Sequence, residues 1–240
     1  MNILITGGSS GLGEAIVKLL SKCSENKIYF TFNKHTEEAE KIALKNKNVF
    51  AIKCDFTNTE DIIELEKTIS VLDLDVLINN AYVGLPQTKH FHKTYPESFQ
   101  SSFENNIMPT IRITQSAILG FRKKKFGKII NILTAYLINL PPVGFSIYTA
   151  NKAYLQQLSK SWNSEYSRYN ITSNCISPEF MKTNFSSFVD ERIVDNMETE
   201  HPLKKLLTPE EVAETVVFLV NSSQQVNGAN IVVNAAQNIS

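Results

Sequence analysis

The sequence predicts an α/β domain with a doubly wound parallel sheet. Short runs of β-branched and aromatic residues alternate with longer helical patterns along the chain, which is typical of a parallel sheet covered by helices on both faces. With 240 residues and 42% apolar side chains, the chain is long enough to bury one large core. Because no break in composition interrupts this pattern, we expect residues 1–240 to form one domain.

The first half of the chain supplies four of the expected strands. An apolar run at residues 2–6 ends in glycines, and a helical pattern follows at 11–21. Strands at 27–32 and 49–53 flank a polar helix at about 37–46. A helix at 59–70 carries apolar residues at helical spacing, and a short apolar run at 76–79 is the fourth strand.

The second half completes the sheet. We expect a long helix within residues 99–124, a strand at 128–133, a helix at 148–166 and a strand at 171–176. The last helix, at 209–220, begins with proline, which is favoured in a first turn, and a strand at 231–233 closes the sheet. The segment 179–207 has no clear period, so we expect it to form a flap over a substrate site.

Composition and charge favour small molecules as partners. Lys plus Arg and Asp plus Glu number 24 each, and the resulting zero net charge argues against binding to nucleic acid or an anionic membrane. The cysteines, Cys23, Cys54 and Cys175, form no C-x-x-C pair, so neither a metal site nor a disulfide framework is expected. The first apolar run is too short for a signal peptide or membrane span, which favours a cytoplasmic protein.

A glycine-rich turn predicts a nucleotide site. The first strand leads directly into Thr6-Gly7-Gly8-Ser9-Ser10-Gly11-Leu12-Gly13, and a helix follows. Glycines allow a tight turn and close approach of the backbone to a pyrophosphate, while the helix N-terminus offers free N–H groups to it. The predicted cofactor contacts in this turn are Gly7, Ser9, Ser10, Gly11, Leu12 and Gly13.

The end of the second strand bears on which cofactor binds. An acidic residue about 20 positions after the glycines is typical of NAD sites, but this chain has Thr31-Phe32-Asn33-Lys34-His35 there. Asn33 and Lys34 can accept the 2′-phosphate that a carboxylate would repel. The sequence therefore favours NADP(H) over NAD(H), unless Lys34 is simply a solvated residue that opens the next helix.

A tyrosine and a lysine predict proton transfer. Tyr148 and Lys152 stand four residues apart, on one face of the expected helix at 148–166. A free tyrosine has a pKa near ~10, and a neighbouring ammonium lowers it by favouring the phenolate. Thr134 follows the strand at 128–133, and ligands of open parallel sheets bind at the carboxyl ends of strands. These side chains predict a site that exchanges a proton with a substrate oxygen.

The order of these motifs resembles that of short-chain dehydrogenases/reductases. The resemblance rests on the glycine turn, Asn79-Asn80-Ala81, Asn106, Thr134, and Tyr148 with Lys152, and it spans essentially the whole chain. It implies a Rossmann-type sheet of seven strands in the order 3-2-1-4-5-6-7. It also implies an oxidoreductase that moves a hydride between a nicotinamide cofactor and a carbonyl or alcohol substrate.

The resemblance implies a role for each motif residue. Tyr148 is the general acid/base, Lys152 lowers its pKa and holds the nicotinamide ribose, and Thr134, where the family usually has serine, orients the substrate carbonyl. Asn106 kinks the long helix and supports a proton-relay water. Asp55 contacts the adenine, although it also fits the N-cap of the next helix. The other implied cofactor contacts are Phe56, Asn80, Ala81, Pro178 and Thr183, while Asn79 fixes the central strands.

Three departures from the family pattern leave alternatives open. Tyr82 replaces the glycine after Asn79-Asn80-Ala81, Glu179 replaces the glycine after Pro178, and the closing V-D-G-G reads Val233-Asn234-Ala235-Ala236. We expect Glu179 to tune the substrate. The main alternative is a catalytically degenerate NADP-binding module with a regulatory or structural role, and a weaker one is an epimerase or dehydratase. The family also implies a homodimer or homotetramer joined through the helices at 99–124 and 148–166.

Overall fold

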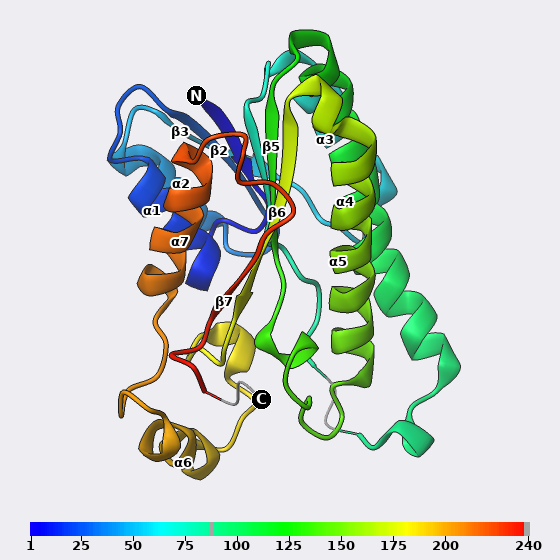
Figure 1. Ribbon diagram of the computed structural model, residues 1–240, viewed down its shortest axis with the longest axis vertical. Helices are drawn as coiled ribbons and strands as arrows, with labels where there is room; N and C mark the ends of the chain where they lie inside the picture. Colours follow the sequence, from blue (N-terminus) through cyan, green and yellow to red (C-terminus); the bar gives the residue numbers. More distant parts are fainter. Residues whose placement is uncertain (87–88, 238–240) are drawn as a thin grey trace.

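A parallel sheet runs through the centre of the molecule in the computed structural model, which describes residues 1–86 and 89–237 (Figure 1). Its strand order is β3-β2-β1-β4-β5-β6-β7, and every neighbouring pair is parallel. This confirms the predicted fold class and strand order. The strands are β1 (Asn2–Ile5), β2 (Lys27–Phe32), β3 (Val49–Lys53), β4 (Val76–Asn79), β5 (Gly127–Ile132), β6 (Ile171–Pro178) and β7 (Asn230–Val233).

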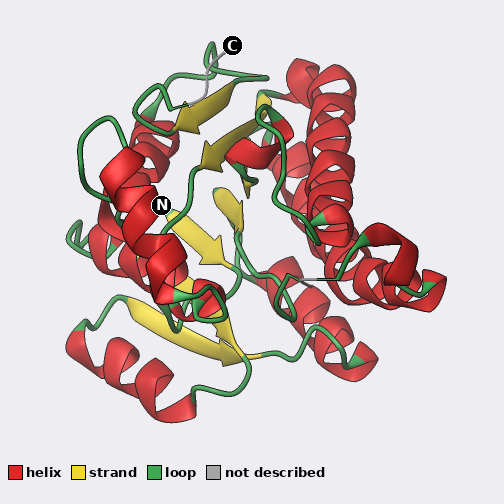
Figure 2. Cartoon of the chain, turned by 90° about the horizontal axis from the view of Figure 1, so that it is seen from below, coloured by secondary structure: helices red, strands yellow, loops and turns green. Residues whose placement is uncertain are grey.

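Helices cover both faces of the sheet (Figures 1 and 2). One face carries α1 (Gly11–Leu20), α2 (Thr36–Lys45) and α7 (Pro209–Asn221), and the other carries α3 (Thr59–Val71), α4 (Pro96–Lys124) and α5 (Ser146–Tyr166). Within the described ranges, no helix combines the length and the apolar character needed to cross a membrane.

Alternating side chains on β1 divide the core into two layers. Ile3 and Ile5 pack in the cluster beneath α1 and α7, whereas Leu4 packs in the cluster beneath α3 and α4. All three side chains are fully buried. Successive side chains of a strand point to opposite faces, so a strand covered on both faces is apolar at every position, which explains the continuous apolar runs in the sequence.

A chain of buried polar side chains crosses the centre of the sheet. Asn79 donates from Nδ2 to Asn131 Oδ1 on β5 at 2.9 Å and to Thr114 Oγ1 on α4 at 3.1 Å. Asn131 in turn lies 3.4 Å from Ser173 on β6, which bonds to Ser159 on α5. These hydrogen-bonded side chains fix the positions of β4, β5 and β6 relative to α4 and α5, in line with the structural role expected for Asn79.

Residues 179–207 contain regular structure that the sequence did not predict. The segment forms a 3-10 turn, η4 (Asn184–Ser186), and a helix, α6 (Glu191–Glu200), whose N-cap Asp190 accepts a hydrogen bond from the Arg192 N–H. Only Val194 of α6 is buried. The apolar residues Ile193, Val194 and Met197 do stand at helical spacing, but this pattern spans only about one turn. The expectation of an irregular segment is wrong for 191–200. The prediction that residues 179–207 cover a substrate remains.

Candidate active site

The glycine turn lies between β1 and α1, as predicted. Gly7 and Gly11 adopt positive φ of 70° and 53°, which is strained for residues with a side chain. A Cβ on Gly13 would stand 1.9 Å from the Gly7 carbonyl oxygen. Ser10, the N-cap of α1, makes no side-chain cap hydrogen bond. The turn therefore presents backbone N–H groups at the positive end of a helix, a site suited to phosphate.

The loop after β4 is tied directly to this turn. Asn80 donates from Nδ2 to the carbonyl oxygens of Thr6 and Gly7, at 2.9 and 3.0 Å. The backbone N–H groups of Asn80 and Ala81 both donate to Thr6 Oγ1. The predicted contacts Asn80 and Ala81 thus border the glycine turn on the β4 side.

The ends of β2 and β3 bring Asn33, Lys34 and Asp55 together. A hydrogen bond from the Thr57 N–H holds the pKa of Asp55 below its ordinary value. The pKa is lowered further by the Thr57 hydroxyl, by Asn33 and by the charge of Lys34. The N-cap of α3 is Asn58 rather than Asp55, so the capping alternative for Asp55 is wrong. An anionic oxygen and an exposed ammonium therefore border the same end of the cleft.

Phe56, another predicted cofactor contact, has its side chain in the core. It is buried with Leu4 and Leu77 beneath α3 and α4. The side chain therefore points away from the surface that Asp55 offers, and a cofactor contact at this position falls to the backbone. The motif Cys54-Asp55-Phe56 gave no means of separating these two roles.

Thr134, Tyr148 and Lys152 gather at the carboxyl ends of the central strands. Thr134 follows β5 and is buried, and Tyr148 and Lys152 lie one turn apart on α5. The Lys152 Nζ donates to the Ile132 carbonyl at 2.7 Å and stands 5.7 Å from the centre of the Tyr148 ring. The three side chains that the sequence singled out are thus neighbours, within reach of one ligand.

Burial dominates the protonation of this group. It raises the pKa of Tyr148 above its ordinary value; nearby Tyr82 adds to this, and a hydrogen bond with Thr134 opposes it. Burial also lowers the pKa of Lys152 to about 8. The expectation that Lys152 lowers the pKa of Tyr148 is not met in this structure, because the ammonium is directed at the Ile132 carbonyl and the phenol is desolvated.

Asn106 anchors the loop after β4 to α4. Its Oδ1 accepts from the Val83 N–H at 2.6 Å, and its Nδ2 donates to the Ser102 carbonyl at 2.9 Å. Helix α4 is continuous from Pro96 to Lys124, although Pro109 lies inside it. The structure thus gives the Asn106 side chain a positioning role, while the predicted proton-relay role remains a prediction.

Aromatic rings surround Tyr148, and the sequence indicated only some of them. The Tyr82 ring packs edge-on against Tyr148 at 5.1 Å, with Lys152 Nζ 5.4 Å from its centre. Phe185, on η4, lies 5.8 Å from the Tyr148 ring and 5.7 Å from the Tyr82 ring. Phe145 adds a third ring at 6.0 Å. Neither phenylalanine belongs to a motif, so only the structure brings them to the site.

The segment after β6 closes the site over the glycine turn. Pro178 ends β6, and Thr183 lies 3.6 Å from where a Cβ on Gly11 would stand. The Thr183 N–H donates to Ser186 Oγ, which fixes the turn that carries Phe185. The predicted contact Thr183 therefore lies beside the glycine turn, and Pro178 lies at the carboxyl end of β6.

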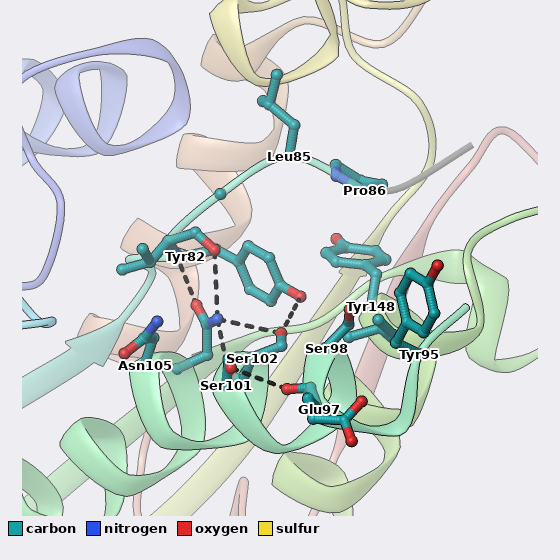
Figure 3. A pocket seen from close by; sticks show the side chains of 14 residues that line it. Tyr82, Leu85, Pro86, Tyr95, Glu97, Ser98, Ser101, Ser102, Asn105 and Tyr148 are labelled. Carbon is teal, nitrogen blue, oxygen red and sulfur yellow. Dashed lines mark hydrogen bonds between the residues drawn. The ribbon is translucent and has the colours of Figure 1, made fainter. Parts of the chain in front are cut away.

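A cavity of about 440 Å³ adjoins Tyr148 (Figure 3). Its walls come from the loop after β4, the first turns of α4 and the start of α5. The Tyr82 and Tyr148 rings point into it from one side, and Ser98, Ser101 and Ser102 border the helix side. The cavity is thus continuous with the Tyr148 site and has both aromatic and hydroxyl walls.

Fold and site together define a class: an α/β oxidoreductase with a nucleotide cradle and a Thr–Tyr–Lys group. The sequence matches the family model described as enoyl-(acyl carrier protein) reductase over residues 7–235. It is 30% identical over 232 residues to the 3-oxoacyl-[acyl-carrier-protein] reductase FabG of Rickettsia prowazekii (strain Madrid E), covering 96% of this chain and 94% of that protein.

Two further comparisons agree. The chain is 30% identical over 220 residues to carbonyl reductase family member 4 of Xenopus laevis, covering 91% of this chain and 90% of that protein. A solved structure described as a short chain dehydrogenase/reductase family protein superposes with a TM-score of 0.85 at 26% identity, covering 98% of this chain and 96% of that one. The chain belongs to the short-chain dehydrogenase/reductase family and is an NAD(P)-dependent oxidoreductase acting on CH–OH or C=O groups.

Proposed function

We propose that this protein is an NADP(H)-preferring carbonyl reductase or alcohol dehydrogenase, with Tyr148 as its general acid/base. The observation that carries the proposal is the meeting of Thr134, Tyr148 and Lys152 at the edge of the sheet that also holds the glycine turn. Two relatives at 30% identity are named as reductases, which supports the same chemistry.

The cradle fits a dinucleotide. At its phosphate end, any side chain on Gly13 would fill the space beneath the turn, and the first N–H groups of α1 are available for hydrogen bonding. At its ribose end, the exposed Lys34 supplies a cation and Asn33 an amide, which suits a 2′-phosphate. These two residues would set the preference for NADP(H).

The chain's own side chains would hold and move the proton. A bound nicotinamide supplies or accepts the hydride. Thr134 Oγ1 and Tyr148 Oη bind the substrate oxygen, and Tyr148 Oη gives it a proton in reduction or takes one in oxidation. Lys152, one turn from Tyr148 on α5, would hold the nicotinamide ribose. The half-buried aromatic rings around Tyr148 would limit the access of water to the reacting atoms.

Replacing Tyr148 with phenylalanine tests the chemistry. We expect turnover of a panel of ketones and aldehydes to fall by on the order of 10²–10⁴, the usual contribution of a general acid, while the Kd for NADPH changes by less than about threefold. Turnover that survives in Tyr148→Phe refutes the assigned role. A wild-type protein that binds NADPH yet reduces no carbonyl refutes the enzyme and supports the degenerate binding module.

Reversing one charge tests the cofactor preference. Lys34→Glu is expected to weaken NADPH binding at least tenfold and to leave NADH binding nearly unchanged, because it places a carboxylate where the 2′-phosphate is proposed to bind. Lys47→Glu reverses an exposed charge in the loop before β3 and serves as the control. If wild-type protein binds NADH more tightly than NADPH in a nicotinamide-fluorescence titration, the proposed preference is wrong.

We also infer a homodimer or homotetramer joined through α4 and α5. The two helices expose the large apolar side chains Met108, Leu119 and Tyr154, which favours a contact between copies over contact with water. Size-exclusion chromatography with light scattering measures the assembly. A monomer at micromolar concentration would contradict this inference.

A further inference from the structure

Glu179 introduces a carboxylate beside the active site. It follows Pro178 at the end of β6, and its backbone N–H donates to the Val233 carbonyl at 3.0 Å, so β7 fixes its position. The side chain is half-buried, and burial raises the pKa of its carboxyl above the ordinary value. Burying a charge is costly unless a partner compensates it.

The carboxylate and its neighbour Asn139 offer more acceptors than the protein satisfies. Asn139 Nδ2 donates to Glu179 Oε2 at 3.5 Å, the outer limit of a hydrogen bond. Asn139 Oδ1 is buried and has no hydrogen-bond partner among the described residues. Within residues 1–86 and 89–237, no Lys, Arg or His forms an ion pair with Glu179. The Phe180 N–H also donates to Glu179 and opposes the rise in its pKa. Buried acceptors in native proteins are normally paired, so Asn139 Oδ1 calls for a donor from outside the chain.

The acceptors lie close to the reacting group. Burial, and to a smaller extent the charge on Glu179, raise the pKa of Tyr136 to about 12. Tyr136 in turn contributes to raising the pKa of Tyr148. The Tyr136 and Tyr148 rings both pack edge-on against Phe145, at 5.5 and 6.0 Å. Asn139 lies just beyond the turn η2 (Ala135–Leu137), which begins at Thr134. Glu179 and Asn139 therefore flank the Thr134–Tyr148 group on the side of β6 and η2.

From this geometry we propose that Glu179 and Asn139 bind a cationic nitrogen of the substrate, so that the preferred substrates are small amino ketones or amino alcohols. The inference rests on the proposed reductase function and names its substrate class. A protonated amine supplies a positive charge and N–H donors to Glu179 and to Asn139 Oδ1. A substrate with a carboxylate or phosphate at this position would meet an uncompensated like charge.

A pair of matched ketones tests the proposal. N-methyl-4-piperidone, protonated at pH 6.5, and 4-methylcyclohexanone are both six-membered cyclic ketones with a methyl group opposite the carbonyl, but only the first carries a charged ring nitrogen. With NADPH-loaded wild-type protein we expect kcat/KM to be at least tenfold higher for the cationic ketone. In Glu179→Gln this ratio should fall to near one. Glu214→Gln removes an exposed carboxylate of α7, outside the segment 179–207, and should keep the wild-type ratio.

Two results overturn the proposal. One is a wild-type kcat/KM ratio near one for the cationic over the neutral ketone. The other is a ratio that stays unchanged in Glu179→Gln, even if the variant reduces both ketones more slowly. If neither ketone is reduced, the proposed function is in question, and recognition is then measured by binding. Saturation-transfer NMR with N-methylpiperidinium should detect binding to the NADPH-loaded wild-type protein and its loss in Glu179→Gln. Equal signals from the two proteins, or none from wild type, refute recognition of the cation.

Discussion

Replacing Lys152 with methionine is expected to stabilise the cofactor-free protein while removing its activity. Burial lowers the pKa of Lys152 from 10.5 to about 8. At ~1.4 kcal/mol per pKa unit, the buried ammonium costs roughly 3 kcal/mol of folding free energy at neutral pH. Methionine has a similar length and no charge. Losing the hydrogen bond to the Ile132 carbonyl destabilises the variant by about 1 kcal/mol. The net increase in its free energy of unfolding is therefore about 2 kcal/mol.

The pH dependence separates this cause from a simple packing effect. Because the pKa of Lys152 is lower in the folded than in the unfolded state, its cost is fully present below about pH 8 and disappears as the pH rises toward 10.5. The stability of the wild-type protein therefore rises relative to that of Lys152→Met between about pH 8 and pH 10.5. For a chain of this size, about 2 kcal/mol at pH 7 corresponds to a Tm difference of roughly 4–8 °C, most of which should be lost by pH 10.

Thermal unfolding followed by circular dichroism at pH 7, 8.5 and 10 measures the effect. Lys160→Met changes an exposed lysine on the same helix and should show no such pH-dependent difference. A Lys152→Met protein that is less stable than wild type at pH 7 refutes the reasoning. A stability difference that stays constant across the three pH values refutes it as well.

Substitutions at four other positions have defined outcomes. Gly13→Ala should abolish NADPH binding in a fluorescence titration, because its Cβ would stand 1.9 Å from the Gly7 carbonyl oxygen, whereas Gly120→Ala, with nothing within 4 Å, should stabilise α4 by ~0.5–1 kcal/mol. Thr134→Ser should keep turnover within about tenfold, and Thr134→Ala should lose on the order of 10² of kcat; equal rates contradict its role. Lys128→Ala should cost roughly 2 kcal/mol in urea unfolding, because its buried ammonium donates to the carbonyls that end α7; an unchanged midpoint contradicts this.

The sequence predicted the sheet and the main site residues because their signals are local. The glycine turn is one continuous motif between a strand and a helix, and Tyr148 and Lys152 stand at helical spacing. Thr134 follows a strand that is buried at every position. In a parallel sheet such strand ends meet at one edge, so local assignments were enough to bring these residues together.

The surroundings of Tyr148 were not predictable in the same way. Tyr82, Phe145 and Phe185 come from three segments far apart in the sequence, and each alone reads as a core or loop aromatic. The pKa of Lys152 depends on where its ammonium points and how deeply it is buried. Both properties arise only when α5 packs on the sheet, and spacing along a helix does not determine them.

The two ends of the cleft differ in how they must respond to an incoming cofactor. The glycine turn is held by hydrogen bonds from Asn80 Nδ2 to the Thr6 and Gly7 carbonyls, whereas the Tyr82, Tyr148 and Phe185 rings are packed against one another. In the proposed binding mode, a nicotinamide that reaches Lys152 would have to separate these rings. Association should therefore have two kinetic phases: a fast one proportional to cofactor concentration, and a slower one whose rate reaches a limit set by the rearrangement of the rings.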